Sequence, residues 1–291
     1  MTVNIVNIAA YKFVSLLREE LPKLKIQLKE KALQCDLKGT VLLSTEGINL
    51  ILAGMKKDID AYQSFLNSYV AFHGLDYKES VSAYKPFTRM LVRIKKEIIS
   101  MGRSDIRPEC QSAPRISPQQ FKKWYQENRE MIILDARNDY EVALGSFERA
   151  IDLQLDSFRG FPDAIDLLPA WMKEKPIVTF CTGGVRCEKA ALIMQNKGFK
   201  EVYQLDGGIL HYFNECGGEH YRGECFVFDH RVAIDTELKE TDTKQCYACR
   251  SPITINEQIT RVCPYCQHLR DARKNSGPNG NHSHRDHTSD G

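Results

Sequence analysis

One stretch in the second half of the chain constrains the fold and the chemistry more than any other. Residues 177–180, Ile-Val-Thr-Phe, form an apolar run that is typical of a buried strand and leads directly into Cys181. Two glycines and Arg186 follow, and then a helical pattern begins. A strand, a tight glycine loop and a helix in this order direct backbone N–H groups and the positive end of a helix dipole at one sulfur atom. The sequence therefore predicts that Cys181 is a thiolate nucleophile with a lowered pKa, and that Arg186 adds a fixed positive charge and a fork of donors.

The spacing between Cys181 and Arg186 indicates the size of the group that the loop can hold. Cysteine-based phosphatases place five residues between nucleophile and arginine, whereas four do so here. These four residues, the predicted anion cradle, are Thr182, Gly183, Gly184 and Val185. The smaller loop suits a group the size of a sulfur atom, and it resembles the loop of rhodaneses, whose cysteine carries a persulfide. The alternative is a buried structural cysteine, but the flanking strand and helix signals favour the nucleophile.

Length and composition are those of a soluble globular protein with room for two domains. The 291 residues are 42% hydrophobic and 27% charged, and no apolar run approaches the roughly 18 residues of a membrane span. The first ten residues lack the pattern of a signal peptide, so we expect a cytoplasmic protein without a membrane partner. The ten cysteines agree with this if they are reduced thiols and metal ligands rather than disulfides. Nothing in the sequence predicts a stable protein partner.

Residues 1–100 alternate between strand and helix patterns. Strands are predicted over 3–9, 40–44, 48–53, 75–83 and 90–99, and helices over 13–33 and 58–70. This βαββαβ order with one extra strand predicts a ferredoxin-like α+β sandwich.

The same hundred residues carry a positive charge. They contain 15 Lys and Arg residues against 10 Asp and Glu residues, a local charge of +5. The basic residues predicted to contact nucleic acid phosphates are Arg89, Arg93, Lys95 and Lys96. A solvated edge strand, whose charges deter pairing with other strands, explains the same residues equally well.

Strand and helix patterns alternate again over residues 119–222, which predicts a parallel sheet with helices on both faces. Residues 101–118 contain prolines and serines without apolar periodicity, and they are predicted to be a linker. Ser117 and Pro118 then have the types of an N-cap and a first helical residue. Further helices are predicted over 161–172 and from Lys189 on.

Three charged residues follow the first predicted strand of this block, at the sheet edge where open α/β proteins bind ligands. They are Asp135, Arg137 and Glu141. We expect them to form an ion-pair and capping network that supports the cysteine loop, with a direct catalytic role as the alternative. Cys187, Cys216 and Cys225 are interpreted as packed thiols, although Cys187 could also act as a resolving thiol.

Residues 223–274 contain four cysteines with the spacing of a metal site. Two Cys-x-x-Cys pairs, separated by 13 residues, supply Cys246, Cys249, Cys263 and Cys266. Four thiolates at this spacing can hold a structural Zn²⁺ ion in a segment too short for a core of its own. An iron site, a redox dithiol pair and metal-free cysteines are the alternatives. Residues 275–291 have no apolar periodicity and predict a disordered tail.

Motifs in the second half of the chain resemble those of one family. They are Asp-Ala-Arg-Asn-Asp-Tyr-Glu at 135–141, Cys-Thr-Gly-Gly-Val-Arg-Cys-Glu-Lys-Ala at 181–190, and Arg-Gly-Glu-Cys-Phe-Val-Phe-Asp at 222–229. They resemble the rhodanese-domain tRNA uridine hydroxylases, over about residues 1–266. The resemblance implies oxygen-dependent 5-hydroxylation of the wobble uridine in tRNA, with Cys181 essential. It implies tRNA as partner and molecular oxygen as co-substrate; the electron donor is unknown.

Three functional interpretations compete. The residues themselves support a sulfurtransferase in which Cys181 accepts a sulfane sulfur and passes it on. The family interpretation keeps this nucleophile but makes a hydroxylated uridine the product, and a basic N-terminal domain and a zinc segment suit a clamp for tRNA. A non-enzymatic binding module is disfavoured by the intact loop. The sequence has no two-His-one-carboxylate arrangement and no dinucleotide loop in the expected context, so it does not indicate how oxygen is activated.

Overall fold

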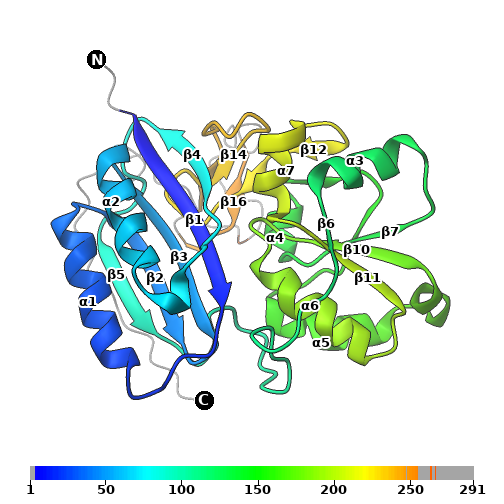
Figure 1. Ribbon diagram of the computed structural model, residues 1–291. Coiled ribbons are helices and arrows are strands. Elements are labelled where there is room, and N and C mark those ends of the chain that lie inside the picture. Colours follow the sequence, from blue (N-terminus) through cyan, green and yellow to red (C-terminus); the bar gives the residue numbers. More distant parts are fainter. Residues whose placement is uncertain (1–3, 247, 255–262, 264–265, 267–291) are drawn as a thin grey trace.

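The computed structural model describes residues 4–246, 248–254, 263 and 266, which form two domains side by side (Figure 1). The predicted tail, 275–291, lies outside the described residues. Within the described ranges, no helix combines the length and the apolar character that a membrane crossing requires.

The first domain is a five-stranded sheet with the order β4-β1-β3-β2-β5. Its strands are β1 (Ile5–Phe13), β2 (Lys38–Ser44), β3 (Gly47–Gly54), β4 (Lys78–Ser82) and β5 (Met90–Ile94). Two helices, α1 (Leu21–Gln34) and α2 (Lys56–Asn67), and the 3-10 turn Val70–Phe72 complete it. β5 runs parallel to β2, and the other neighbours are antiparallel. The predicted ferredoxin-like sandwich with an extra strand is confirmed.

The first predicted helix begins later than expected. β1 continues to Phe13, which pairs with Gly47 of β3, so helix α1 starts only at Leu21. Apolar residues at 13, 16 and 17 fit a helical period, but the strand ladder provides hydrogen bonds for this stretch instead.

The sheet of the first domain has two different faces. On β2, Val41 and Leu43 are buried in a core with Leu24 and Leu28 of α1. The alternate residues Thr40 and Leu42 point away from the helices. The face without helices is therefore turned toward the second domain, and we call it the open face.

The second domain is a parallel sheet with the order β6-β11-β10-β7-β9. Its strands are β6 (Arg115–Ile116), β7 (Ile132–Asp135), β9 (Ala150–Asp152), β10 (Pro176–Phe180) and β11 (Glu201–Leu205). The helices are α3 (Pro118–Gln126), α4 (Asp139–Val142), α5 (Phe161–Ala164), α6 (Val185–Asn196) and α7 (Gly208–Cys216), with 3-10 turns at Phe158–Gly160, Ile165–Leu167 and Ala170–Glu174. Successive residues of β10 enter different cores, Ile177 with α6 and Val178 with α3 and α7, which confirms helices on both faces.

Two expectations for this domain need correction. The helix predicted over 161–172 is broken into short pieces, because Leu168 takes an extended conformation before Pro169. The predicted linker, 101–118, is not a plain connection. Met101, Ile106 and Ala113 are buried in the core of the second domain, and β6 pairs with β11.

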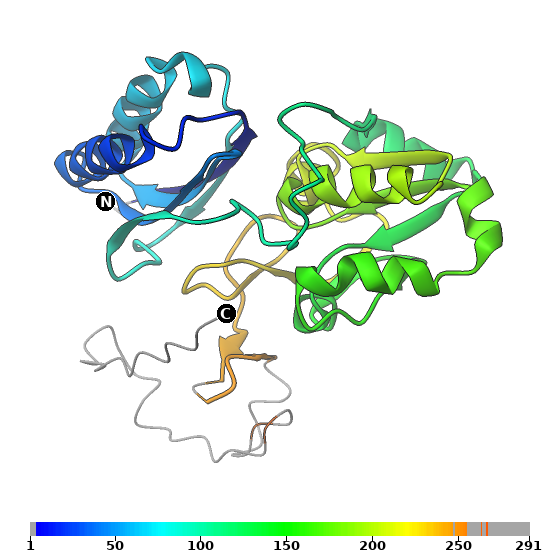
Figure 2. The same cartoon turned by 90° about the horizontal axis from the view of Figure 1, so that it is seen from below.

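The segment after residue 222 joins the two domains (Figure 2). β12 (Tyr221–Gly223) pairs with β8 (Gly145–Phe147), and the two-stranded pair β13 (Cys225–Phe226) and β14 (Ala233–Ile234) follows. Between these strands, Arg231 Nη1 donates to Ser80 Oγ of β4 at 2.8 Å, and the His230 N–H donates to the Pro86 carbonyl at 2.9 Å. The pair β15 (Lys244–Gln245) and β16 (Pro252–Ile253) lies beyond.

Candidate active site

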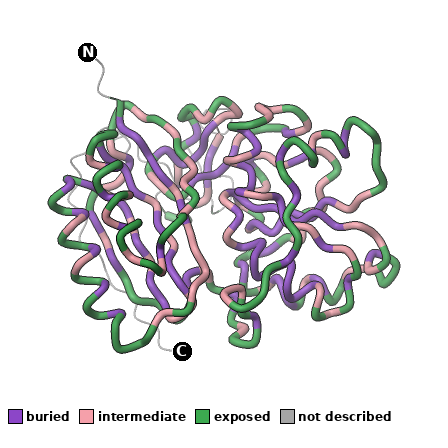
Figure 3. Tube along the Cα trace, viewed as in Figure 1, coloured by how far each residue is buried: buried purple, intermediate pink, exposed green. Residues whose placement is uncertain are grey.

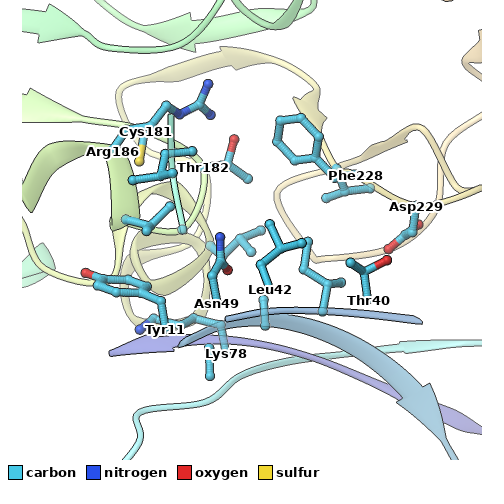
Figure 4. Close-up of a pocket in the computed structure, with 18 of the residues that line it drawn as sticks. Tyr11, Thr40, Leu42, Asn49, Lys78, Cys181, Thr182, Arg186, Phe228 and Asp229 are labelled. Carbon is cyan, nitrogen blue, oxygen red and sulfur yellow. The ribbon is translucent and has the colours of Figure 1, made fainter. Parts of the chain in front are cut away.

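The sharp turn after β10 places Cys181 beneath the start of α6 (Figure 4). Gly184 caps this helix with a φ of +93°, a conformation that suits glycine. Its N–H donates to Cys181 Sγ at 3.2 Å. A Cβ atom at this position would lie 2.9 Å from Tyr11 Oη of the first domain. The helix begins at Val185, earlier than the sequence predicts, so the first helical turn is part of the loop.

The loop favours the thiolate form of Cys181. The side chain is buried, and burial alone raises the pKa of a thiol. A hydrogen bond from Cys187, the charge of Arg186 and the backbone N–H groups of Arg186 and Cys187 outweigh burial and lower the pKa of Cys181 to about 6. This agrees with the prediction from sequence. Near neutral pH the sulfur is therefore mostly ionised and nucleophilic.

Alkylation measures this ionisation directly. We expect the rate of Cys181 modification by a small alkylating reagent to rise with pH and to reach half its maximum near pH 6, because only the thiolate reacts. Mass spectrometry of the peptide that contains Cys181 gives the rate, and exposed Cys110 in the same sample is the internal control. A midpoint for Cys181 near 9 would contradict the thiolate assignment.

Arg186 is fixed in place by Glu141 from below the loop. The two side chains form a buried bidentate pair, with Arg186 Nη1 2.5 Å from Glu141 Oε2 and Nη2 2.7 Å from Oε1. Thr182 Oγ1 also donates to Glu141, at 3.2 Å. Burial raises the pKa of Glu141. The charge and hydrogen bonds of Arg186 lower this pKa by more than burial raises it, so the pKa of Glu141 lies below its ordinary value.

Asp135 and Arg137 form a second buried pair, with 2.7 Å between Arg137 Nη2 and Asp135 Oδ2. Arg137 Nη2 also donates to the Gly145 carbonyl, at 2.6 Å, and Ser146 Oγ donates to Asp135. The Asn138 N–H donates to Glu141, as in a helix cap. The expected ion-pair and capping network is thus present, and its residues lie beside the loop rather than in front of Cys181.

The other thiols near the loop are buried and protonated. Cys187 and Cys225 are fully buried, and burial raises the pKa of both, that of Cys225 to about 12. They fit the expectation of packed thiols, and Cys187 also supplies a hydrogen bond to Cys181.

Cys181 lines a cavity of about 560 Å³ between the two domains (Figure 4). One wall is the cysteine loop with Thr182 and Arg186, and the opposite wall is the open face of the first domain. The third wall is the segment around Phe228, after β13. Cavities of roughly 300–1,000 Å³ with mainly apolar walls are typical of small-molecule sites. The nucleophile therefore faces a space that both domains enclose.

Charged residues of α6 tie the domains together. Every residue of α6 from Arg186 to Met194 is buried (Figure 3). Lys189 is fully buried, and its Nζ lies 2.9 Å from Glu46 and 2.6 Å from Glu97, both in the first domain. The neighbouring Glu188 accepts a hydrogen bond from Tyr11 Oη at 3.1 Å. Sequence reasoning missed these contacts; the available signal was two adjacent charges in a helix of otherwise apolar pattern.

The four basic residues proposed to contact nucleic acid are exposed, with Arg89 just before β5, Arg93 in it, and Lys95 and Lys96 just after it. Arg93 pairs in register with Leu42 of β2 and so shares the open face with it. Lys95, two residues farther on, lines the cavity. Within the described residues, no ion pair is recorded for Arg89, Arg93, Lys95 or Lys96. Among the described residues their positive charge is thus unpaired, at the edge of the sheet that forms one cavity wall.

The four cysteines of the C-terminal segment come together. Their Sγ atoms all lie within 4.8 Å of one another, with 3.9 Å between Cys246 and Cys266 and 3.8 Å between Cys249 and Cys263. Four sulfurs at ~2.3 Å from a central ion have edges of about 3.8 Å in a tetrahedron. The donor set and its size thus fit a tetrahedral metal ion.

Two family models match the chain. Residues 5–98 match the UPF0176 acylphosphatase like domain, and residues 117–215 match the Rhodanese-like domain. A rhodanese-like domain protein from Staphylococcus aureus of known crystal structure is 24% identical and covers 34% of this chain and 91% of its own, with a TM-score of 0.30.

Curated relatives match almost the whole chain. The tRNA uridine(34) hydroxylases of Cupriavidus pinatubonensis and Ralstonia nicotianae are each 47% identical over 274 residues, which cover 90% of this chain and 96% of each relative. The chain belongs to the tRNA uridine(34) hydroxylase family.

Proposed function

We propose that this protein hydroxylates C5 of the uridine at position 34 of tRNA, with Cys181 as the nucleophile and molecular oxygen as co-substrate. The observation that carries the proposal is a thiolate-stabilising loop that opens into a two-domain cavity, in a chain whose relatives are named tRNA uridine(34) hydroxylase. The names of those relatives suggest the product, a hydroxylated uridine, and the geometry of the loop suggests Cys181 as the nucleophile. Such an enzyme would act in the cytoplasm, where tRNA is used.

The sulfur can activate the uracil ring by adding to C6. As the S–C6 bond forms, the electrons of the C5=C6 double bond move onto C5 and the O4 carbonyl, and C5 becomes nucleophilic. After oxygen is transferred to C5, loss of the C5 proton and departure of the sulfur restore the double bond. One atom of O₂ enters the base and the other leaves as water, so an external reductant must supply two electrons and two protons. The terminal sulfur of a Cys181 persulfide could add in the same way.

The loop residues have separate tasks in this reaction. Backbone N–H groups such as that of Gly184 stabilise the anionic sulfur as attacking and as leaving group. Arg186, held by Glu141, keeps a positive charge beside it. Thr182, Gly183 and Val185 shape the space in front of the sulfur, where a ring or a sulfane sulfur could approach.

The experiment that tests this function is nucleoside mass spectrometry of total tRNA from cells that lack the gene, with and without the wild-type chain. Loss of 5-hydroxyuridine derivatives and their return with the wild-type chain are expected. A persulfide sulfurtransferase is the second candidate, favoured by the four-residue spacing of the loop. Unchanged hydroxyuridine together with altered thio-nucleosides or persulfide levels would support that candidate and exclude the hydroxylase.

We further propose that Arg89, Arg93, Lys95 and Lys96 bind phosphates of the tRNA anticodon arm, because all four are exposed in or next to the edge strand β5 and Lys95 lines the cavity. Replacing both Arg89 and Arg93 by Ala should weaken tRNA binding equally for all tRNA sequences. The slope of log K against log salt concentration should fall by about one for each lost phosphate contact. Fluorescence anisotropy at several salt concentrations gives both values. Lys25→Ala, an exposed residue of helix α1 that does not line the cavity, is the control. An unchanged slope would mean that these residues do not contact phosphates and only keep the edge strand solvated.

The cysteine cluster is proposed to hold a structural Zn²⁺ ion. The purified protein should contain about one zinc per chain, and replacing buried Cys246 or Cys263 by Ser should remove it, because three thiolates and a hydroxyl hold zinc more weakly than four thiolates. Elemental analysis of the purified variants gives the zinc content. Cys216→Ser, outside the cluster, should keep the metal. Iron or no metal in the wild-type protein would overturn the assignment.

A further inference from the structure

Phe228 is an exposed aromatic residue in the catalytic cavity. Its side chain is 49% exposed, although it lines the same space as Cys181. An apolar ring in contact with water gains free energy when another flat apolar surface covers it. The ring points into the cavity beside Arg186, whose guanidinium carbon lies 5.8 Å from the ring centre (Figure 4).

Residues before and after Phe228 in the sequence are anchored and so hold its ring in place. Phe226 packs against it edge to face, with 5.1 Å between ring centres, and is itself buried against Tyr140. On the other side, Asp229 is buried and paired with Arg231, which reaches Ser80 of the first domain. An exposed ring that is held between two anchored neighbours is preorganised for a partner.

The wall opposite Phe228 is the open face of the first sheet, which presents apolar side chains such as Leu42 and Ile51 between polar ones such as Thr40. Figure 4 shows Leu42 and Thr40 of the open face across the cavity from the ring, with Cys181 at one end of the space between them. A planar ring that lies in this space would contact Phe228 on one side and the sheet on the other, with its edge near the sulfur. Splayed nucleobases are bound in this way, by stacking on aromatic side chains.

We propose that Phe228 is the stacking platform for the target nucleobase. The proposal rests on the proposed function and adds a residue that binds the substrate. A base in the anticodon loop must leave its stack to reach a sulfur inside a cavity, and stacking on Phe228 replaces the contacts that it loses.

Binding of two RNA hairpins tests the proposal. One hairpin carries the anticodon loop with uridine at position 34, and the other carries an abasic ribose there. The wild-type protein should bind the uridine hairpin roughly 5- to 150-fold more tightly, the range expected for one base–aromatic stack. Phe228→Ala should bring this ratio close to one, whereas Phe228→Trp should keep it. Phe228→Leu, which keeps an apolar side chain without a π-face, should lose most of it.

Two controls separate stacking from other effects. Trp171→Ala removes an exposed aromatic side chain that does not line the cavity, and it should leave the ratio unchanged. If Phe228 acted through Arg186 instead, Phe228→Ala would raise the pH midpoint of Cys181 alkylation; for a stacking platform the midpoint stays near 6. A ratio in Phe228→Ala as large as in the wild type, or a wild-type ratio of one, would overturn the proposal. Failure of the proposed function is seen separately, as unchanged hydroxyuridine in cells without the gene.

Discussion

Replacing Cys181 by Ser should abolish the modification of tRNA, with a loss of activity of about 10³-fold or more. A serine hydroxyl stays protonated in a loop that lowers the pKa of a thiol only to about 6, so no anionic nucleophile remains. The loop should otherwise be preserved, because the two side chains differ by one atom and Gly184 can donate to either. The measurement is the hydroxyuridine content of tRNA from cells without the gene that produce the variant.

The matched control is Cys110→Ser, which removes an exposed thiol away from the cavity. It should restore hydroxyuridine to the wild-type level. Tryptophan fluorescence of both purified variants reports folding of the second domain, which holds both tryptophans of the chain. Full modification by a folded Cys181→Ser variant would exclude both sulfur additions considered above.

Replacing Glu141 by Gln should lower the free energy of unfolding of the second domain by about 3–5 kcal/mol. The change keeps the shape of the side chain but leaves the buried guanidinium of Arg186 without a counter-charge. Urea unfolding followed by tryptophan fluorescence measures the loss. Glu127→Gln removes one partner of an exposed pair with Lys123, and it should cost under ~1 kcal/mol.

A double variant tests whether the unpaired charge of Arg186 causes this loss of stability. Glu141→Gln with Arg186→Met removes both charges, and it should recover much of the stability while activity stays lost. A Glu141→Gln protein as stable as the wild type would mean that the pair contributes little to folding.

The same pair makes stability depend on pH. The pKa of Glu141 in the folded protein is lower than its ordinary value near 4.5, so the unfolded chain takes up a proton at higher pH than the folded one. The contribution of Glu141 is therefore fully present above about pH 4.5 and is lost as the pH falls toward and through the lowered pKa. In the Glu141→Gln variant, this part of the acid dependence should be missing.

The local parts of the site could be predicted from sequence because their signals are local. A strand pattern, two glycines and a helix pattern within fourteen residues define the turn that places Cys181 under a helix start. Asp135, Arg137 and Glu141 follow one strand, and their charge and position suggested a supporting network, although the pair of Glu141 with Arg186 was not foreseen. The spacing of the two Cys-x-x-Cys pairs alone likewise predicted that the four cysteines lie close together.

Contacts between the domains could not be predicted in this way. Nothing in one sequence links Lys189 to Glu97, 92 residues away, or Tyr11 to Glu188, 177 residues away. The sequence also did not indicate that the open face of the first sheet lines a cavity. Thr40 and Leu42 alternate with buried residues, as in any strand with one exposed face. Residues 101–118 looked like a linker because short strands such as β6 contain too few residues to show a period.

The helix that follows the nucleophile also has a consequence for how this enzyme can change. Its first turn is part of the loop around Cys181, while its next two residues, Glu188 and Lys189, contact the other domain. A second domain transferred to another protein would lose both carboxylates that pair with Lys189. Substitutions at Glu46 or Glu97, remote in sequence, would act on the helix that shields the sulfur. An exchange of one half alone would therefore break the contacts that join the two domains at this helix.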